Sequence, residues 1–214
     1  MPFMTQPTRP IRLYRHPLSG HSHRVELFLS LLKLPFELID VDLTQGEQKS
    51  PGFLARNPFG QVPVIEDGEV TLADSNAILV YLATRYDPSG RWLPREPVAA
   101  ARVQQWLSVA AGLLASGPAT ARLVAVFGRK LDAERAKEIA SQLYAVLDPH
   151  LSTRSFLVGD EPTLADVALY TYTAHAPEGG VSLEPYGNVR AWLARIEALP
   201  GFVPMRRTPT RFAA

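Results

Sequence analysis

The segment "VPVIEDGEVTL" (62–72) restricts the possible folds of this chain more than any other segment. Two short apolar runs are joined by Asp67-Gly68, a dipeptide that is typical of the tight turn in an antiparallel hairpin. Before this hairpin, the chain alternates strand and helix patterns, as parallel βαβ units do. A parallel unit that continues into an antiparallel hairpin predicts a small mixed sheet of four strands.

The patterns around the hairpin predict the remaining elements of the first domain. Residues 11–15 ("IRLYR") predict a short strand, and apolar residues from Val25 to Leu32 recur at helical spacing. Residues 36–43 alternate apolar and acidic side chains, which indicates a half-buried strand followed by a short helix. Residues 74–86 begin with a capping residue and continue with a helical period. This order of elements predicts a thioredoxin-like domain.

The pattern changes at a linker rich in proline and glycine over residues 88–97. Strand patterns become scarce after it, so residues 1–87 and 98–214 are predicted to form separate domains, the second one all-helical. Thr163 and Asp166 are expected to have structural roles, because their spacing forms an acidic variant of the capping box. Helical patterns cover residues 98–117, 132–151, 162–172 and 188–199.

The composition excludes several classes of function. The chain has 22 basic and 21 acidic residues and a net charge of +1, so it lacks the basic field that binds nucleic acid. It has no cysteine, which excludes disulfides, thiolate metal sites and a cysteine nucleophile. The N-terminus has no apolar signal-peptide core, and no unbroken apolar run is long enough to predict a membrane span. We expect a cytoplasmic protein that binds neither nucleic acid nor membranes.

Residues 16–24 ("HPLSGHSHR") gather three histidines and two serines between a predicted strand and a predicted helix. One interpretation is a metal site, but the histidines lack helical spacing and no acidic or sulfur ligand stands close to them. Another is a Ser-His hydrolase with Ser19 or Ser22 as the nucleophile, but the Gly-x-Ser-x-Gly elbow of such enzymes is absent. We expect no metal here.

Two other features predict an unusual backbone and an anion site. Pro63 stands where a strand would donate a hydrogen bond, so it must lie at an edge, a bulge or a cis turn. Asp74 and Ser75 open a predicted helix, whose free N–H groups and dipole favour an anion. Capping of the helix alone would also explain this pair.

In this order and spacing, the features resemble the cytosolic glutathione transferase family, in particular its serine-type, bacterial theta-like and nu-like members. The resemblance extends from about Ile11 to Phe202. It implies that glutathione is the co-substrate and that its thiolate attacks a small hydrophobic electrophile. The electrophile would lie in an apolar site lined from the early turns of the helix that contains Trp106, a residue expected to be in the core. The motifs are the serine-containing turn, Val62-Pro63, Asp74-Ser75 and "PTLAD" (162–166).

The resemblance assigns the sulfur of glutathione to the turn at 16–24. Ser19 would stabilise the thiolate with a hydrogen bond and with the dipole of the following helix, and His21 would be a second donor. Helix capping remains an alternative role for Ser19, and a solvated loop position remains one for His21. Ser22 and His23 are expected to be structural residues of the first helical turn.

The resemblance also implies how the rest of glutathione binds. Val62, before a cis Pro63 with a structural role, would pair its backbone with the cysteinyl part like an added strand. Asp74, where the family usually has Glu, would bind the γ-glutamyl amine, and Ser75 would bind the γ-glutamyl carboxylate. The candidates for the glycine carboxylate are Gln48, Lys49 and Gln61.

Other functions on the same fold remain open at this stage. Glutathione-dependent disulfide reduction, peroxidase activity and isomerisation need no protein thiol, and a related chain could also be a non-catalytic interaction module. The resemblance further implies a two-fold homodimer, with Phe53 and Phe59 as candidate anchors of the interface.

Overall fold

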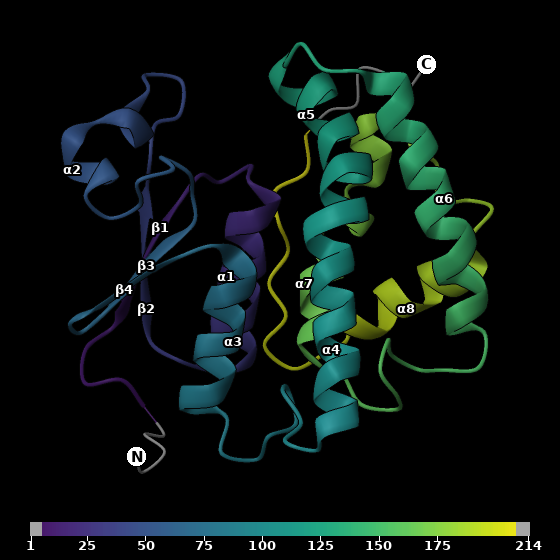
Figure 1. The fold of residues 1–214 in the computed structure, drawn as a ribbon, viewed down its shortest axis with the longest axis horizontal. Helices are drawn as coiled ribbons and strands as arrows, with labels where there is room; N and C mark the ends of the chain where they lie inside the picture. Colours follow the sequence, from purple (N-terminus) through teal and green to yellow (C-terminus); the bar gives the residue numbers. More distant parts are fainter. Residues whose placement is uncertain (1–5, 209–214) are drawn as a thin grey trace. The chain divides into compact units, whose positions relative to one another are not determined.

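In a computed structural model of the protein, residues 6–208 are described, and they form two compact units (Figure 1). The first unit contains the residues up to Leu93 together with Leu199–Arg206, and the second contains Pro94–Ala198 together with Arg207 and Thr208. The first unit is a mixed α/β domain and the second is all-helical. The predicted fold class is therefore confirmed.

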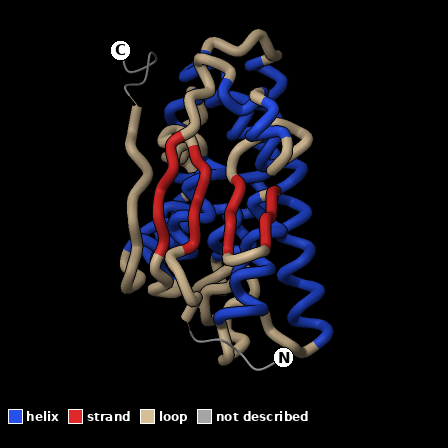
Figure 2. Tube along the Cα trace, turned by 90° about the vertical axis from the view of Figure 1, so that its left-hand side faces the viewer, coloured by secondary structure: helices blue, strands red, loops and turns tan. Residues whose placement is uncertain are grey.

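The first unit is built on a four-stranded mixed sheet in the order β2-β1-β3-β4 (Figure 2). β1 runs parallel to β2 and antiparallel to β3, and β3 and β4 form the predicted hairpin. Gly68 has a φ of 61° in its turn, a conformation that glycine adopts without steric cost. The strands are β1 (Ile11–Arg15), β2 (Phe36–Asp40), β3 (Val64–Asp67) and β4 (Val70–Ala73).

Helices cover both faces of this sheet. α1 (Gly20–Leu31) and α3 (Ser75–Tyr86) contact each other and lie on one face (Figure 1). The 3-10 helix η1 (Glu47–Lys49) and α2 (Pro51–Leu54) lie on the other. There, Phe53 of α2 packs in an apolar cluster with Tyr14 and Val64 of the sheet. Both layers fix the sheet, so its ends are held in place for the loops that follow them.

Two predicted strands are longer than the observed ones. The strand predicted over 36–43 ends at Asp40, although Val41 is buried next to the sheet in the apolar cluster. The alternation of apolar and acidic residues therefore indicates which side chains are buried, and it continues past the last residue of β2 that pairs with β1. β3 begins at Val64 and not at Val62, because Pro63 has no N–H to donate.

A segment that follows the helical unit completes the first unit. The Ser30 hydroxyl donates to the carbonyl of Gly201 at 2.6 Å, and His23 Nε2 donates to the carbonyl of Val203 at 2.9 Å. A Cβ on Gly201 would lie 2.8 Å from the carbonyl oxygen of Ser30, so glycine permits this approach. Residues 199–206 thus pack with the first unit, whereas the sequence places them in the helical domain.

The second unit is a bundle of helices. The helix predicted over 98–117 continues to Phe127, because its middle part is π-helical and accommodates Pro118 without ending. A Cβ on Gly117 would lie 2.9 Å from the backbone nitrogen of Ala140, so glycine lets two helices pack closely. The elements are α4 (Pro97–Val109), η2 (Ala110–Ala119), α5 (Thr120–Phe127), α6 (Ala133–Leu151), α7 (Leu164–Ala174), η3 (Ala176–Gly179) and α8 (Gly187–Glu197).

The helical stretch from Pro97 to Phe127 is long and apolar enough, by length and composition alone, to cross a membrane. Its mean hydropathy is 1.5 in the most apolar window, of which 39% is buried within the protein. It is not an unbroken apolar run, because Gln, Ser and Gly interrupt it. Core helices of soluble proteins pass the same test, so the finding is weak evidence for a membrane span.

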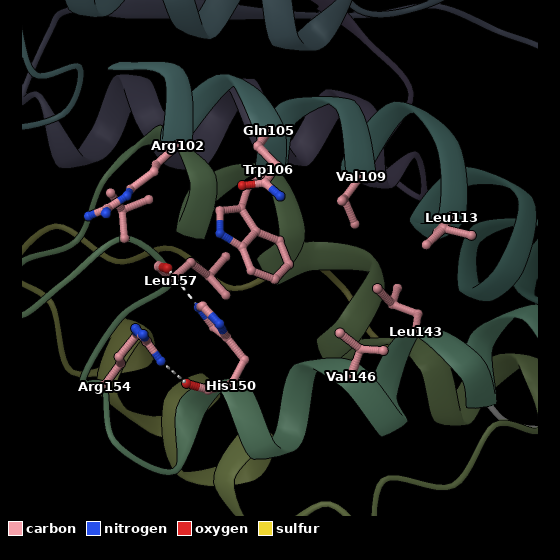
Figure 3. A pocket seen from close by; sticks show the side chains of 11 residues that line it. Arg102, Gln105, Trp106, Val109, Leu113, Leu143, Val146, His150, Arg154 and Leu157 are labelled. Carbon is pink, nitrogen blue, oxygen red and sulfur yellow. Dashed lines mark hydrogen bonds between the residues drawn. The ribbon is translucent and has the colours of Figure 1, made fainter. Parts of the chain in front are cut away.

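A groove of about 400 Å³ opens between α4 and α6 (Figure 3). Trp106, which was expected in the core, is half-buried on its wall and lies against His150 with ring centroids 4.9 Å apart. His150 Nε2 donates to the carbonyl of Leu157 at 2.9 Å, which fixes the imidazole in place. The apolar side chains along the groove include Val109, Leu113, Leu143 and Val146.

Asp166 joins three parts of the second unit. Its Oδ2 accepts from the N–H of Thr163 at 2.8 Å, and the Thr163 hydroxyl in turn caps α7. Its Oδ1 accepts from the N–H of Leu157 and from Trp192 Nε1, each at 2.9 Å. Burial raises the pKa of Asp166, although these hydrogen bonds lower it. The carboxyl group thus connects the loop before α7, α7 itself and α8.

We expect Asp166→Ala to lower the free energy of unfolding by about 3 kcal/mol, because it leaves several buried donors without an acceptor. The control is Asp132→Ala, which removes an exposed N-cap from α6 and should cost about 1 kcal/mol. Urea denaturation followed by circular dichroism measures both. Equal losses in the two variants would contradict the connecting role of Asp166.

Candidate functional site

The strand register brings the predicted site segments to one end of the sheet. Tyr14 pairs with Val64, and Val64 pairs with Ala73. Arg15 at the end of β1 pairs with Asp40 at the end of β2. The loops after β1, β2 and β4 and the loop before β3 therefore meet at this end. These loops carry Ser19, His21, Gln48, Lys49, Gln61, Val62, Asp74 and Ser75, or lead directly to them.

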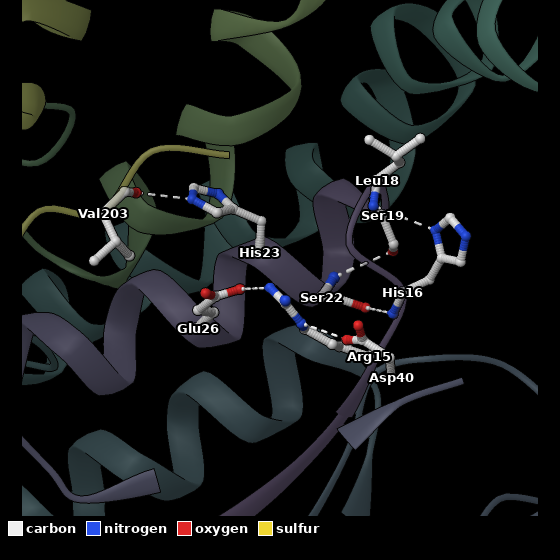
Figure 4. A network of polar contacts seen from close by, with 9 residues as sticks. All are labelled: Arg15, His16, Leu18, Ser19, Ser22, His23, Glu26, Asp40 and Val203. Atoms are coloured by element: carbon white, nitrogen blue, oxygen red, sulfur yellow. Dashed lines mark hydrogen bonds and ion pairs between the residues drawn. The ribbon is translucent and has the colours of Figure 1, made fainter. Parts of the chain in front are cut away.

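Ser19 caps α1 at this end of the sheet (Figure 4). Its Oγ accepts a hydrogen bond from the N–H of Ser22 at 3.2 Å, and its side chain is half-buried. A capping hydroxyl accepts through a lone pair and keeps its proton. Ser19 can therefore cap α1 and still donate a hydrogen bond to an anion near the positive end of the helix.

The three histidines of the turn have different partners. His16 Nδ1 accepts from the N–H of Leu18 at 3.3 Å, whereas His23 contacts Val203 on the opposite side of α1 (Figure 4). His21 Nδ1 lies 3.3 Å from the hydroxyl oxygen of Ser75. Within residues 6–208, no group of three or more metal-type ligands is found. The turn thus distributes its imidazoles among three separate contacts.

The imidazole of His21 is held in its neutral form. Burial, together with the positive charge of Arg24, lowers the pKa of His21 to about 3. The neutral ring has one donor nitrogen and one acceptor nitrogen. A ring whose Nδ1 accepts the Ser75 proton carries its own proton on Nε2.

The N-terminus of α3 is held by Asp74 and by an arginine from α1. Asp74, with a φ of 70°, caps the helix through Oδ1, which accepts from the N–H groups of Asn76 and Ala77 at 3.0 and 2.9 Å. Arg24 Nη1 donates to the Ser75 hydroxyl oxygen and to Asn76 Oδ1, both at 2.8 Å. Arg24 was not predicted as a site residue from the sequence. Its only sequence signal is a charged residue next to Val25, where the apolar helical pattern of α1 begins.

The peptide bond between Val62 and Pro63 is cis. The ladder between β1 and β3 begins at Val64, so the N–H and C=O groups of Val62 lie outside it. Before this bond, Asn57 Nδ2 donates to the carbonyl of Gln61 at 2.8 Å, while the Gln61 side chain is exposed. The backbone at Val62 can therefore pair with an extended ligand.

Gln48 and Lys49 differ in their surroundings. Gln48 is half-buried, and its Oε1 is buried with no hydrogen-bond partner among the residues that the structure describes. Lys49 is exposed, and its Nζ donates to the carbonyl of Phe59 at 3.0 Å. Both stand in the loop region that follows β2, at the site end of the sheet.

Comparisons with known proteins match both units to domains of the same protein family. Residues 9–84 match the family model of the glutathione S-transferase N-terminal domain, and residues 107–200 match that of the C-terminal domain. Glutathione S-transferase 3 from Zea mays is 38% identical over 205 residues, which cover 90% of this chain and 91% of the relative.

Solved structures agree with these matches. A glutathione S-transferase from Pseudomonas fluorescens has a TM-score of 0.86 at 33% identity and covers 92% of this chain and 99% of its own. A glutathione transferase homolog from Drosophila mojavensis, with bound glutathione, has a TM-score of 0.81 at 27% identity and covers 89% of each chain.

The lowered pKa of His21 predicts that its ring stays neutral across physiological pH. Its pKa is lowered from 6.5 to about 3, so protonation should occur only in strong acid, whereas an exposed histidine titrates near 6.5. We expect the ring-proton NMR signals of His21, assigned with His21→Gln, to stay constant between about pH 5 and pH 8. A titration within this range would contradict the partly buried contact of His21 with Ser75.

Proposed function

The chain belongs to the glutathione S-transferase family, and from this premise we propose that the site end of its sheet binds glutathione and that Ser19 stabilises the thiolate. The protein is a glutathione transferase, which activates the thiol for attack on an electrophile. One observation supports the site assignment above all others. The strand register brings the Ser19 turn, the cis bond before Pro63 and the N-terminus of α3 together.

The cysteine-free chain has to take its reactive sulfur from the ligand. A thiol with an ordinary pKa of about 8.5 is mostly protonated at neutral pH, and each unit of lowering corresponds to about 1.4 kcal/mol. The free proton of the Ser19 hydroxyl and the positive end of α1 both favour the charged sulfur. His21 is a second donor only through a neutral N–H, because burial keeps the ring uncharged.

The γ-glutamyl end of glutathione fits the N-terminus of α3. Its carboxylate would accept from the hydroxyl and the backbone N–H of Ser75, because the N–H groups of Asn76 and Ala77 already donate to Asp74. Among the described residues, both hydrogen bonds of Asp74 use Oδ1, so Oδ2 can accept from the γ-glutamyl amine. The shorter side chain of Asp, compared with the usual Glu, thus serves as a cap and as a ligand at once.

The remaining parts of glutathione follow the cis bond toward the loop after β2. The cysteinyl backbone would pair with the N–H and C=O groups of Val62. We assign the glycine carboxylate to the neighbourhood of Gln48, Lys49 and Gln61, where Lys49 offers a positive charge that already bonds the Phe59 carbonyl. The second substrate would be a small hydrophobic electrophile.

The comparisons favour transfer over the other functions of this fold. The relatives are named glutathione transferases, whereas reductase, peroxidase, isomerase and interaction-module roles have no comparable support. Three features remain predictions. They are catalysis by a serine, activity without a metal, and a cytoplasmic location without membrane attachment.

We also propose that the protein forms a two-fold homodimer through Phe59. Phe53 is 4% exposed and belongs to the core, whereas Phe59 is 79% exposed. The loop that carries Phe59 is held by Asn57 Oδ1, which accepts from the Phe59 N–H at 3.1 Å, and by Lys49. The groove between α4 and α6 of a second copy offers aromatic and aliphatic walls for this ring. Each copy would supply one ring and one groove, so the assembly closes.

We expect Ser19→Ala to raise the pKa of the bound thiol and to lower turnover by on the order of 10²-fold, while glutathione still binds. Calorimetry gives the affinity, and thiolate absorbance against pH gives the pKa. The control is Ser22→Ala, because Ser22 is buried and its Oγ accepts from the backbone of His16. No heat with the native protein would refute the binding site, and an unshifted thiol in both proteins would leave Ser19 as a cap only.

The dimer predicts that Phe59→Ser produces a monomer at micromolar concentration, because it removes the anchor from both symmetric contacts of the interface. Sedimentation velocity measures the change. Leu38→Ser is the control, since Leu38 is also an exposed apolar residue of the first unit, at 41% exposure, and lies on β2 away from the loop. A Phe59→Ser protein with unchanged mass would place the interface elsewhere.

A further inference from the structure

Arg24 is one of the largest fully buried side chains of the protein, with 1% of its surface exposed. It projects from α1 to the first turn of α3, where the γ-glutamyl carboxylate is proposed to bind. We propose that Arg24 is a positioning residue for that carboxylate, because it sets the Ser75 hydroxyl and the first turn of α3 before the ligand arrives. This inference rests on the proposed glutathione site.

The contact with Arg24 determines what the Ser75 hydroxyl can do. A guanidinium group can only donate, so the Ser75 oxygen must accept from Nη1 at 2.8 Å. The hydroxyl proton therefore points to another acceptor, and His21 Nδ1 lies 3.3 Å away. A carboxylate is a stronger acceptor than a neutral imidazole, so it takes this proton when it binds.

The same nitrogen also fixes the backbone around the hydroxyl. Arg24 Nη1 donates to Asn76 Oδ1, while the Asn76 N–H donates to the Asp74 carboxylate. The first residues of α3 are thus held from both sides, which reduces the ordering that ligand binding has to impose. The positive charge of Arg24 adds to the positive end of the α3 dipole, so it also favours a bound anion.

Arg24 and Ser19 act on opposite ends of the ligand. Ser19 donates at the N-terminus of α1 to the sulfur, whereas Arg24 acts through Ser75 on the γ-glutamyl carboxylate. The loss of Arg24 should therefore weaken the binding of glutathione and leave the pKa of the bound thiol unchanged. If Arg24 had a purely structural role, its loss would lower the stability of the protein without weakening glutathione binding selectively.

The first test is Arg24→Gln, examined in steady-state kinetics and calorimetry. We expect KM and Kd for glutathione to rise about tenfold, with kcat at saturating glutathione within about twofold of the native value. The thiolate absorbance profile of the bound ligand should match that of the native protein. Arg24→Lys keeps the charge with a single donor group, so it should restore part of the affinity, and it replaces Arg24→Gln if that variant does not fold.

Two further measurements assign the effect to the carboxylate. The ligand 4-aminobutyryl-cysteinylglycine keeps the amine of glutathione and lacks this carboxylate, so the native protein and Arg24→Gln should bind it equally. In the Ser75→Ala background, Arg24→Gln should weaken glutathione binding by less than about threefold, because the two residues act through one contact. Arg15→Gln is the matched control, since Arg15 pairs with Glu26 of α1 at 2.6 Å and should leave KM unchanged.

The possible outcomes separate this inference from the proposed function. If the native protein binds no glutathione, the proposed site itself is wrong. If it binds glutathione and the Arg24 variants lower only the melting temperature, with native KM, the positioning role is refuted. An equal loss of affinity for the ligand without the carboxylate would also refute it.

Discussion

The antiparallel pairing of β3 with β1 is the contact on which the proposed site depends. Because Tyr14 lies opposite Val64, the end of β1 and the beginning of β3 share one end of the sheet. The hairpin then returns β4 to this end and starts α3 there. A slip of one residue in this register would move the core residues Leu13 and Ile65 to the other face, so burial of the core also fixes the positions of the site loops.

Local patterns in the sequence were sufficient to predict most helices and strands. Features that depend on contacts between distant residues could not be predicted from these patterns. Asp67-Gly68 predicted the hairpin because a tight turn is specified by local residues, although Asp67 ends β3 opposite Val70 and the two turn residues are Gly68 and Glu69. The passage of the helix through Pro118 was not predicted, because it depends on packing against α6. Likewise, Val41 extended an alternating pattern beyond the strand, since its burial comes from Phe53 and Tyr14.

The candidate site shows the same division. Motifs with a characteristic spacing contain Ser19, Val62 and Asp74, so these residues could be predicted as site residues from the sequence. The contacts of Ser75 with His21 and Arg24 join residues more than fifty positions apart, at 3.3 and 2.8 Å. One sequence contains no signal for such a pair. Their effect is physical as well as geometric, because the buried charge of Arg24 helps to keep His21 neutral.

The return of residues 199–206 to the first unit has a consequence for biosynthesis. Ser30 and His23 find their partners at Gly201 and Val203, which follow the helical stretch 94–198 in the sequence. During translation, the mixed sheet can form early, but α1 lacks these contacts until the residues that follow the helical stretch 94–198 have left the ribosome. The first unit is therefore completed only after residues 94–198 have been synthesised, and the intervening helical unit has time to fold before the segment docks.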